Sequence, residues 1–169
     1  EGSDPKETAP KIFQGAFQNS GQVCIAIKRA YVHESIYDAM CDELVKLANA
    51  AVVGDGLQQG VTLGPLQNKT QFEKVLGIIE SAKADGKVIA GGARATEKGY
   101  FIQPTIVRDI TDGTRLVDEE QFGPVLPVIK FKDAVDAVAR ANSSDYGLGG
   151  SIWSQALSRS LDQIEPPRP

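Results

Sequence analysis

The chain has 169 residues, of which 41% are hydrophobic and 24% charged, a composition typical of a globular protein with one buried core. Its formal net charge of −4 argues against nucleic acid or an anionic membrane as a partner, because both would require a basic face. The sequence has no apolar run long enough to span a bilayer. Its two cysteines are too few for a disulfide framework and predict free thiols, so we expect a cytoplasmic protein.

Helix signals alternate with strand signals along the chain. The expected elements are, in order, a helix from residue 4, a strand over 25–32, a helix over 36–51, a helix between Asn68 and Gly86, a strand from 87, an extended segment over 99–110, a strand over 124–131, a helix over 133–142, a strand over 148–154 and a helix over 155–165. This order predicts an α/β fold with a mostly parallel sheet flanked by helices.

Local signals support several of these elements. Asp4, followed by Pro5, is a typical helix N-cap, as are Asn68 and Asp133 before their helices. In the strand over 25–32 the alternation places Ile25 and other apolar residues inward. Pro104 should restrict the extended segment around it to a sheet edge or a bulge.

Cys24 is the first candidate for chemistry. It stands between a glycine-containing turn and the alternating run in "FQNSGQVCIAIKRAYV". A partly exposed thiol is the best side-chain nucleophile near neutral pH, but a buried structural cysteine is the commoner case for such a residue taken alone. For Cys41, beside Met40 in an amphipathic helix, the structural interpretation is preferred.

His33 offers Cys24 no base. It is the only histidine and stands at the far end of the expected strand, and a strand rises about 3.3 Å per residue, which separates the two side chains too far for a dyad. One histidine and two scattered cysteines also give no metal-ligand spacing, so we expect no metal site.

The second candidate is the stretch "DEEQFGPVLPV", residues 118–128. By itself it is a solvated acidic turn with Phe122 packed into the core. A carboxylate can also accept hydrogen bonds from paired sugar hydroxyls, and an aromatic ring can support a flat cofactor. The stretch alone does not choose between these interpretations.

Taken together, the segments resemble the catalytic domain of the NAD(P)-dependent aldehyde dehydrogenase family. "FQNSGQVC" resembles the family's cysteine signature and "EEQFGPVLPV" its second motif. "LGPLQNKTQFEKVLGIIESAKADG", "GYFIQPTIV" and "ANSSDYGLGGSIWS" resemble the neighbouring blocks in the same order. The resemblance covers residues 4–165, with residues 1–3 interpreted as a junction remnant and 166–169 as a Pro-rich tail outside the family pattern.

The resemblance implies a role for three residues. Cys24 matches the nucleophile that attacks the aldehyde carbon, and its backbone N–H would be one donor to the developing oxyanion. Glu120 matches the glutamate that binds the nicotinamide-ribose hydroxyls, and Phe122 matches the aromatic residue that positions the nicotinamide. The implied reaction oxidises an aldehyde to a carboxylic acid with NAD or NADP through a thiohemiacetal and a thioester.

The resemblance also implies missing parts. The family's dinucleotide-binding domain, its general base and its oxyanion asparagine match nothing in this chain, and "PPRP" replaces a family strand. We therefore expect a domain that is incomplete at both ends, binds no cofactor by itself and is almost inactive. An exposed sheet edge and an uncovered apolar surface should favour a homo-oligomer.

Two further functions stay open on the sequence. One is a non-enzymatic module that binds full-length subunits through the shared oligomer surface. The other is a thiol esterase that uses Cys24 without a cofactor, against which the missing base argues. The sequence names neither the aldehyde nor the choice between NAD and NADP.

Overall fold

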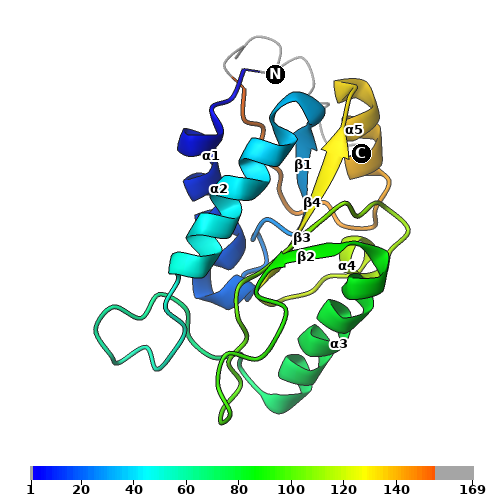
Figure 1. Ribbon diagram of the computed structural model, residues 1–169. Helices are drawn as coiled ribbons and strands as arrows, with labels where there is room; N and C mark the ends of the chain where they lie inside the picture. Colours follow the sequence, from blue (N-terminus) through cyan, green and yellow to red (C-terminus); the bar gives the residue numbers. More distant parts are fainter. Residues whose placement is uncertain (1, 155–169) are drawn as a thin grey trace.

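A computed structural model describes residues 2–154 of the chain, and Figure 1 shows a sheet with helices on both sides. The elements are α1 (Pro5–Phe17), a 3-10 turn (Gln18–Gly21), β1 (Ala30–His33), a 3-10 turn (Glu34–Ile36), α2 (Tyr37–Ala50), α3 (Lys69–Asp85), β2 (Lys87–Ala90), β3 (Thr105–Arg108), α4 (Arg115–Asp118), β4 (Val125–Phe131) and α5 (Ala134–Asn142). None of the helices in the described part of the chain is long and apolar enough to cross a membrane.

The sheet has four strands in the order β1-β4-β3-β2. β4 pairs in parallel with both β1 and β3, and β2 pairs antiparallel with β3. The expected α/β fold with a mostly parallel sheet is confirmed. Because β1, β4 and β3 run in the same direction, their carboxyl ends lie at one end of the sheet and their amino ends lie at the opposite end.

Alternating side chains of the central strands build two cores. Ile106 and Leu126 face α1 and α2, where they pack with Tyr37 and Leu44 among others. Their neighbours in the strands, including Val107 and Val125, face α3 and α4. Because successive strand residues point to opposite faces, the continuous apolar runs of β3 and β4 supply both cores at once.

Helix caps are formed as the sequence predicts. The Asp4 carboxylate accepts from the backbone N–H of Lys6. Asn68 and Asp133 accept in the same way from the first turns of α3 and α5. Each cap satisfies a backbone donor that the helix itself leaves unpaired.

The strand expected over 25–32 begins later than predicted. Residues 25–29 form no ladder, and Ile25, predicted to face inward, is 68% exposed. The chain turns after Val23, whose carbonyl accepts from Ala26, and the N–H of Ile27 then bonds to Gly15 in α1 at 3.0 Å. The backbone here pairs with a helix, and the ladder starts only at Ala30.

One other strand prediction is wrong, and a second is wrong in part. Residues 148–154 form no strand: Leu148 is exposed, and three nearby glycines offer no side chain to pack on a sheet. β3 is an interior strand rather than an edge, and Pro104 lies just before its first residue, so its missing N–H is outside the ladder. The bulge expected as the alternative has a counterpart in the register shift of the β2–β3 pair, which falls between Val88 and Ala90 of β2. The helix expected over 155–165 and the tail over 166–169 lie outside the described residues.

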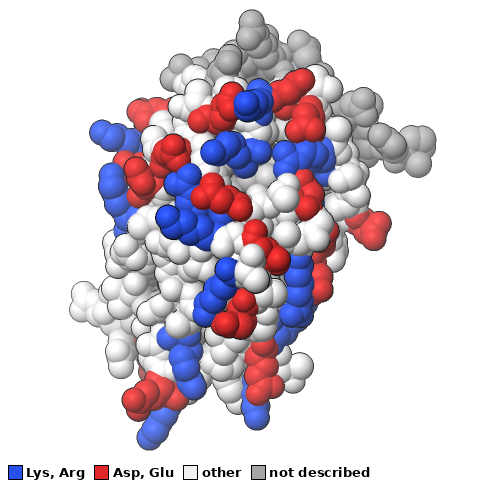
Figure 2. Space-filling view, turned by 45° about the vertical axis from the view of Figure 1, so that its right-hand side comes forward, with Lys and Arg blue, Asp and Glu red and all other residues white. Residues whose placement is uncertain are grey.

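The surface carries charges of both signs. On the face shown in Figure 2, acidic and basic side chains are interspersed, without a broad patch of either sign. Several are paired, for example Lys83 with Glu80 at 2.6 Å and Arg108 with Asp38 at 2.5 Å.

Candidate active site

Cys24 lies on the short turn between α1 and β1, and its side chain is exposed. The 3-10 turn before it includes Asn19 and Ser20, both with positive φ, followed by Gly21 with φ of 74°. Backbone in this left-handed region costs energy for residues other than glycine, and such strain is commonly found where a functional group must be presented. The cysteine is thus placed at the surface by a strained, well-defined turn.

Hydrogen bonds from this turn to the segment before α3 fix its position. Ser20 Oγ donates to the carbonyl of Gly64 at 2.8 Å. The Gln22 side chain donates to the carbonyl of Pro65 at 3.3 Å and accepts from the N–H of Gln67 at 2.8 Å. Ser20 is almost fully buried although its side chain is polar, because this bond satisfies its hydroxyl.

The second motif forms a turn between α4 and β4 that α3 holds in place. Lys74 Nζ donates to the carbonyl of Glu120 at 2.9 Å. The Gln71 amide donates to the next two carbonyls, those of Gln121 and Phe122, at 2.8 and 3.0 Å. Phe122, like Asn19 and Ser20, has a positive φ, here 50°, and its ring is half-buried.

The two motifs meet at their glycines. A Cβ placed on Gly21 would lie 2.3 Å from the carbonyl oxygen of Gly123, so the backbones of the two turns are in direct contact. A Cβ on Gly123 would in turn lie 2.5 Å from the Val75 side chain of α3. Only glycine leaves room for the two backbones to approach so closely. This close approach brings the Cys24 turn against the Phe122 turn.

Lys28 lies among all three residues that the sequence singled out. Its Nζ is 4.9 Å from the centroid of the Phe122 ring. Burial lowers the pKa of Lys28, the Glu120 carboxylate and the Cys24 thiol act to raise it, and Lys74 lowers it. The Phe122 ring is therefore within contact range of the ammonium, and the charges of Glu120 and Cys24 act on its pKa.

Sequence reasoning missed Lys28 and Gln121. In the predicted strand Lys28 has an outward position. The one sequence feature that could have singled it out is its place four residues after Cys24. Gln121 is fully buried, whereas Phe122, which the isolated motif was expected to pack into the core, is only half-buried. The Gln121 amide nitrogen donates to the carbonyls of Lys28 and Leu116, both at 3.0 Å.

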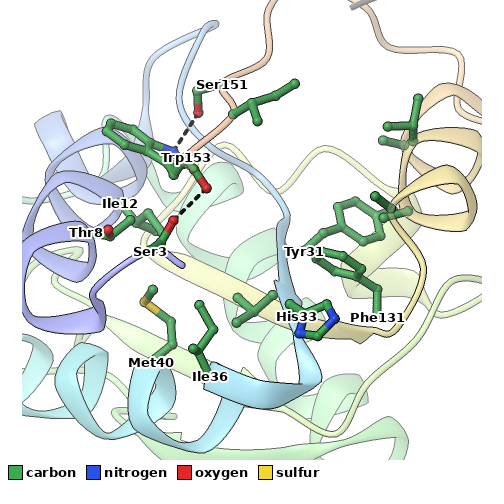
Figure 3. A pocket seen from close by; sticks show the side chains of 16 residues that line it. Ser3, Thr8, Ile12, Tyr31, His33, Ile36, Met40, Phe131, Ser151 and Trp153 are labelled. Atoms are coloured by element: carbon green, nitrogen blue, oxygen red, sulfur yellow. Dashed lines mark hydrogen bonds between the residues drawn. The ribbon is translucent and has the colours of Figure 1, made fainter. Parts of the chain in front are cut away.

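An apolar pocket of about 220 Å³ lies elsewhere, along the outer edge of β1. Figure 3 shows it between Ile12, Met40, Phe131 and Trp153, and Ser3 Oγ donates to the Trp153 carbonyl at its rim. Its lining includes His33, which stacks edge-on against Phe131 at 5.4 Å, and none of the three candidate site residues. Among residues 2–154, no group of three His, Cys, Asp or Glu side chains could hold a metal ion.

Comparison with known proteins identifies a single family. The model of the aldehyde dehydrogenase family matches residues 1–166. The chain is 44% identical over 162 residues to the mitochondrial aldehyde dehydrogenase of Leishmania tarentolae, which covers 95% of this chain and 32% of that protein. It is 41% identical over 149 residues to the mouse (Mus musculus) protein named aldehyde dehydrogenase, cytosolic 1, covering 88% of this chain and 30% of the mouse protein.

A solved structure has the same fold. The NAD⁺ complex of aldehyde dehydrogenase from Bacillus cereus is 42% identical with a TM-score of 0.92, over 96% of this chain and 33% of that one. The chain thus spans about a third of the length of the relatives it matches.

Proposed function

Because the chain belongs to the aldehyde dehydrogenase family, we propose that it supplies the nucleophile and part of the cofactor site of an enzyme that oxidises an aldehyde to a carboxylic acid with NAD(P)⁺. The observation that carries this proposal is the contact of Gly21 with Gly123, which places the Cys24 turn against the Phe122 turn. Hydride transfer needs the reacting carbon and the nicotinamide within near-attack distance, so the two turns must be neighbours.

In the proposed reaction the Cys24 sulfur forms a bond to the aldehyde carbon. The carbonyl electron pair moves to the oxygen, and the thiol proton passes to solvent. The backbone N–H of Cys24 donates to that oxygen, a contact typically worth a few kcal/mol in a dry site. Water later cleaves the thioester to release the acid and restore the thiol.

The residues of the second motif fit the cofactor by their chemistry. The Glu120 carboxylate can accept hydrogen bonds from the two hydroxyls of a ribose, and the Phe122 ring offers a flat apolar face. The chemistry that bound NAD(P)⁺ supplies is acceptance of the hydride from the carbon on the Cys24 sulfur. Lys74 and Gln71 of α3 bind the backbone carbonyls of Glu120 and of the two residues after it, and these bonds set the position of the turn that carries Glu120.

A chimeric enzyme tests this function. Residues 1–154 of this chain replace the matching segment of the Bacillus cereus aldehyde dehydrogenase, and reduction of NAD⁺ by an aldehyde is followed by absorbance. We expect turnover that falls at least about a thousandfold in Cys24→Ser, as for loss of a covalent nucleophile. The matched control Cys41→Ser should keep the chimera's rate. A folded chimera that is inactive, or one that is unaffected by Cys24→Ser, would contradict the proposal.

We expect the 169-residue chain alone to bind no NAD(P)⁺ and to be almost inactive, because the family's general base and oxyanion amide match none of its residues. Turnover on the order of 1 per second or faster, the range of ordinary enzymes, would contradict this expectation. An ester substrate run in parallel tests the thiol-esterase alternative, which requires hydrolysis that is lost in Cys24→Ala.

The apolar pocket beside β1 supports a second candidate function, a homo-oligomer or interaction module. β1 has a ladder partner on one side only, and Ile152 and Trp153 at the pocket rim are 45% and 40% exposed. We expect Ile152→Lys to lower the mass measured by light scattering from that of an oligomer to that of a monomer. Leu57→Lys, a substitution at a residue that is 96% exposed on a distant loop, should leave it unchanged. Wild-type protein that is monomeric at all concentrations would exclude this function.

The proposed location is the cytoplasm. Both cysteines of the chain are free thiols, as a reducing compartment would maintain. The relatives named above include a protein called mitochondrial and a protein called cytosolic, so imaging of the tagged protein in its own cells is the direct test.

A further inference from the structure

The Lys28 side chain joins the turn that carries Cys24 to the turn that carries Phe122, and the roles assigned so far do not use it. Its ammonium donates to the carbonyl of Gly21 at 2.8 Å. Its Nζ lies 4.9 Å from the centroid of the Phe122 ring, within the range of a cation–π contact. One side chain thus touches both motifs at the point where their backbones meet.

The Lys28 backbone is held as firmly as its ammonium. Its carbonyl accepts from the buried Gln121 amide at 3.0 Å, and the side chain is half-buried. Gln121 and Phe122 are neighbours in the second motif. This motif therefore contacts both the backbone carbonyl and the ammonium group of Lys28. A lysine bound at both ends has little freedom to move its charge into solvent.

We propose that Lys28 is a positioning residue for the nucleophile: it fixes the Phe122 turn against Gly21 and keeps a positive charge on the turn that leads into Cys24. The proposal rests on the function proposed above for Cys24, because only a reacting sulfur needs such a neighbour. Lys28 touches no reacting atom itself. It acts through Phe122 and through the electrostatic field at the thiol.

Three titratable groups act on the pKa of the Lys28 ammonium. They are Glu120 and Cys24, which favour its positive form, and Lys74, which disfavours it. Lys74 is bound to the Glu120 carbonyl on the exposed side of the same turn. Because the ammonium is fixed to the Gly21 carbonyl, in the turn just before Cys24, it should assist attack by the Cys24 sulfur.

Alkylation of the 169-residue chain tests the proposal without any cofactor or aldehyde. The rate of Cys24 labelling by iodoacetamide is measured by peptide mass spectrometry across pH 6.5–10.5. We expect Lys28→Met to slow labelling about three- to tenfold at pH 7.5, the effect of removing one nearby charge. Lys28→Arg should keep the wild-type rate because it keeps the charge.

Lys74→Met is the matched control, since it removes a lysine of α3 that binds the Glu120 carbonyl of the same turn but does not bind Gly21. It should not slow labelling. An equal change in Lys28→Met and Lys28→Arg at every pH would indicate a merely structural role and overturn the proposal, as would no change in Lys28→Met.

Nuclear magnetic resonance provides a second measurement that does not depend on the thiol. The ring of Phe122 should shift the ε-methylene protons of Lys28 upfield, and Phe122→Leu should remove that shift. An unshifted Lys28 signal in the folded wild-type chain would contradict the geometry. If the labelling pattern is found but the chimera is inactive, the proposed function fails while the placement of Lys28 stands.

Discussion

Gly21 and Gly123 are in backbone contact, and a Cβ on Gly21 would lie 2.3 Å from the Gly123 carbonyl oxygen. These two residues belong to motifs separated by some hundred positions in the sequence. Their contact is what allows Cys24, Lys28 and Phe122 to lie in one place.

Gly21→Ala tests that contact. Gly21 has φ of 74°, and alanine would add both left-handed strain and a clash with backbone that cannot rotate away. We expect the free energy of unfolding, measured with urea, to fall by about 2–4 kcal/mol. Gly60→Ala is the control, because Gly60 has φ of 86° with nothing within 4 Å of its Cβ position. It should cost only the strain, about 1–2 kcal/mol. Equal losses in both variants would show that the two turns are not in contact.

The two cysteines should differ sharply in reactivity. Cys24 is exposed, whereas Cys41 is fully buried, and burial raises the pKa of Cys41 to about 11. At pH 8 an alkylating reagent should therefore label Cys24 and leave Cys41 unmodified until the chain is unfolded with urea. Mass spectrometry of the two cysteine peptides measures both. Comparable labelling of Cys41 in the folded chain would mean that α2 does not pack as described.

Tyr37 should make stability depend on alkaline pH. Burial raises the pKa of Tyr37 from 10.0 to about 12. Its hydroxyl donates to the Val128 carbonyl at 2.9 Å and accepts from the Asp109 N–H at 2.8 Å. A raised pKa in the folded state favours the neutral hydroxyl, so its contribution is complete below pH 10 and is lost as pH rises toward 12.

Tyr37→Phe should accordingly lower the free energy of unfolding by about 1–3 kcal/mol at pH 8, because the buried Val128 carbonyl and the part-buried Asp109 N–H lose their hydrogen bonds. The deficit should shrink between pH 10 and pH 12. Tyr146→Phe, at an exposed residue, is the control and should be neutral at both pH values. A deficit that is the same at pH 8 and at pH 12 would argue against the buried hydroxyl.

Gln121 should be important for stability although one of its polar atoms has no partner. Its amide nitrogen donates to the carbonyls of Lys28 and Leu116, while its Oε1 has no hydrogen-bond partner in the described part of the chain. Gln121→Leu removes the unpaired oxygen but deprives two carbonyls of their donor. We expect a net loss of about 1–3 kcal/mol in urea unfolding. Gln58→Leu on an exposed loop should change little, and a neutral Gln121→Leu would mean that these bonds contribute nothing.

Much of the fold follows from local signals. Asp4, Asn68 and Asp133 were assigned as caps from sequence alone, and each accepts a backbone N–H in the structure. The helices over α2 and α3 followed from apolar residues at helical spacing. Such features are predictable because their energies arise within a few residues of the chain.

The features that escaped prediction depend on distant partners. Ile25 is exposed because the backbone of Ile27 bonds to Gly15 of α1 rather than to a strand, which no alternation pattern reveals. Gln121 is buried because its amide finds carbonyls on two other segments. The roles of the three candidate site residues came from a resemblance to a family, and the contact of Lys28 with the Phe122 ring emerged only from the packing of the two turns.

The central claim is that the Cys24 sulfur reacts with an aldehyde carbon, and an acid quench of the chimeric enzyme tests it most directly. The chimera is mixed with NAD⁺ and an aldehyde, quenched within the first turnover, digested and analysed by mass spectrometry. The account predicts that the Cys24 peptide carries the acyl group of the aldehyde, in place of the thiol hydrogen, and that the peptide containing Cys41 does not. Reduction of NAD⁺ with an acyl group on any other residue, or with an unmodified Cys24 throughout, would contradict the account.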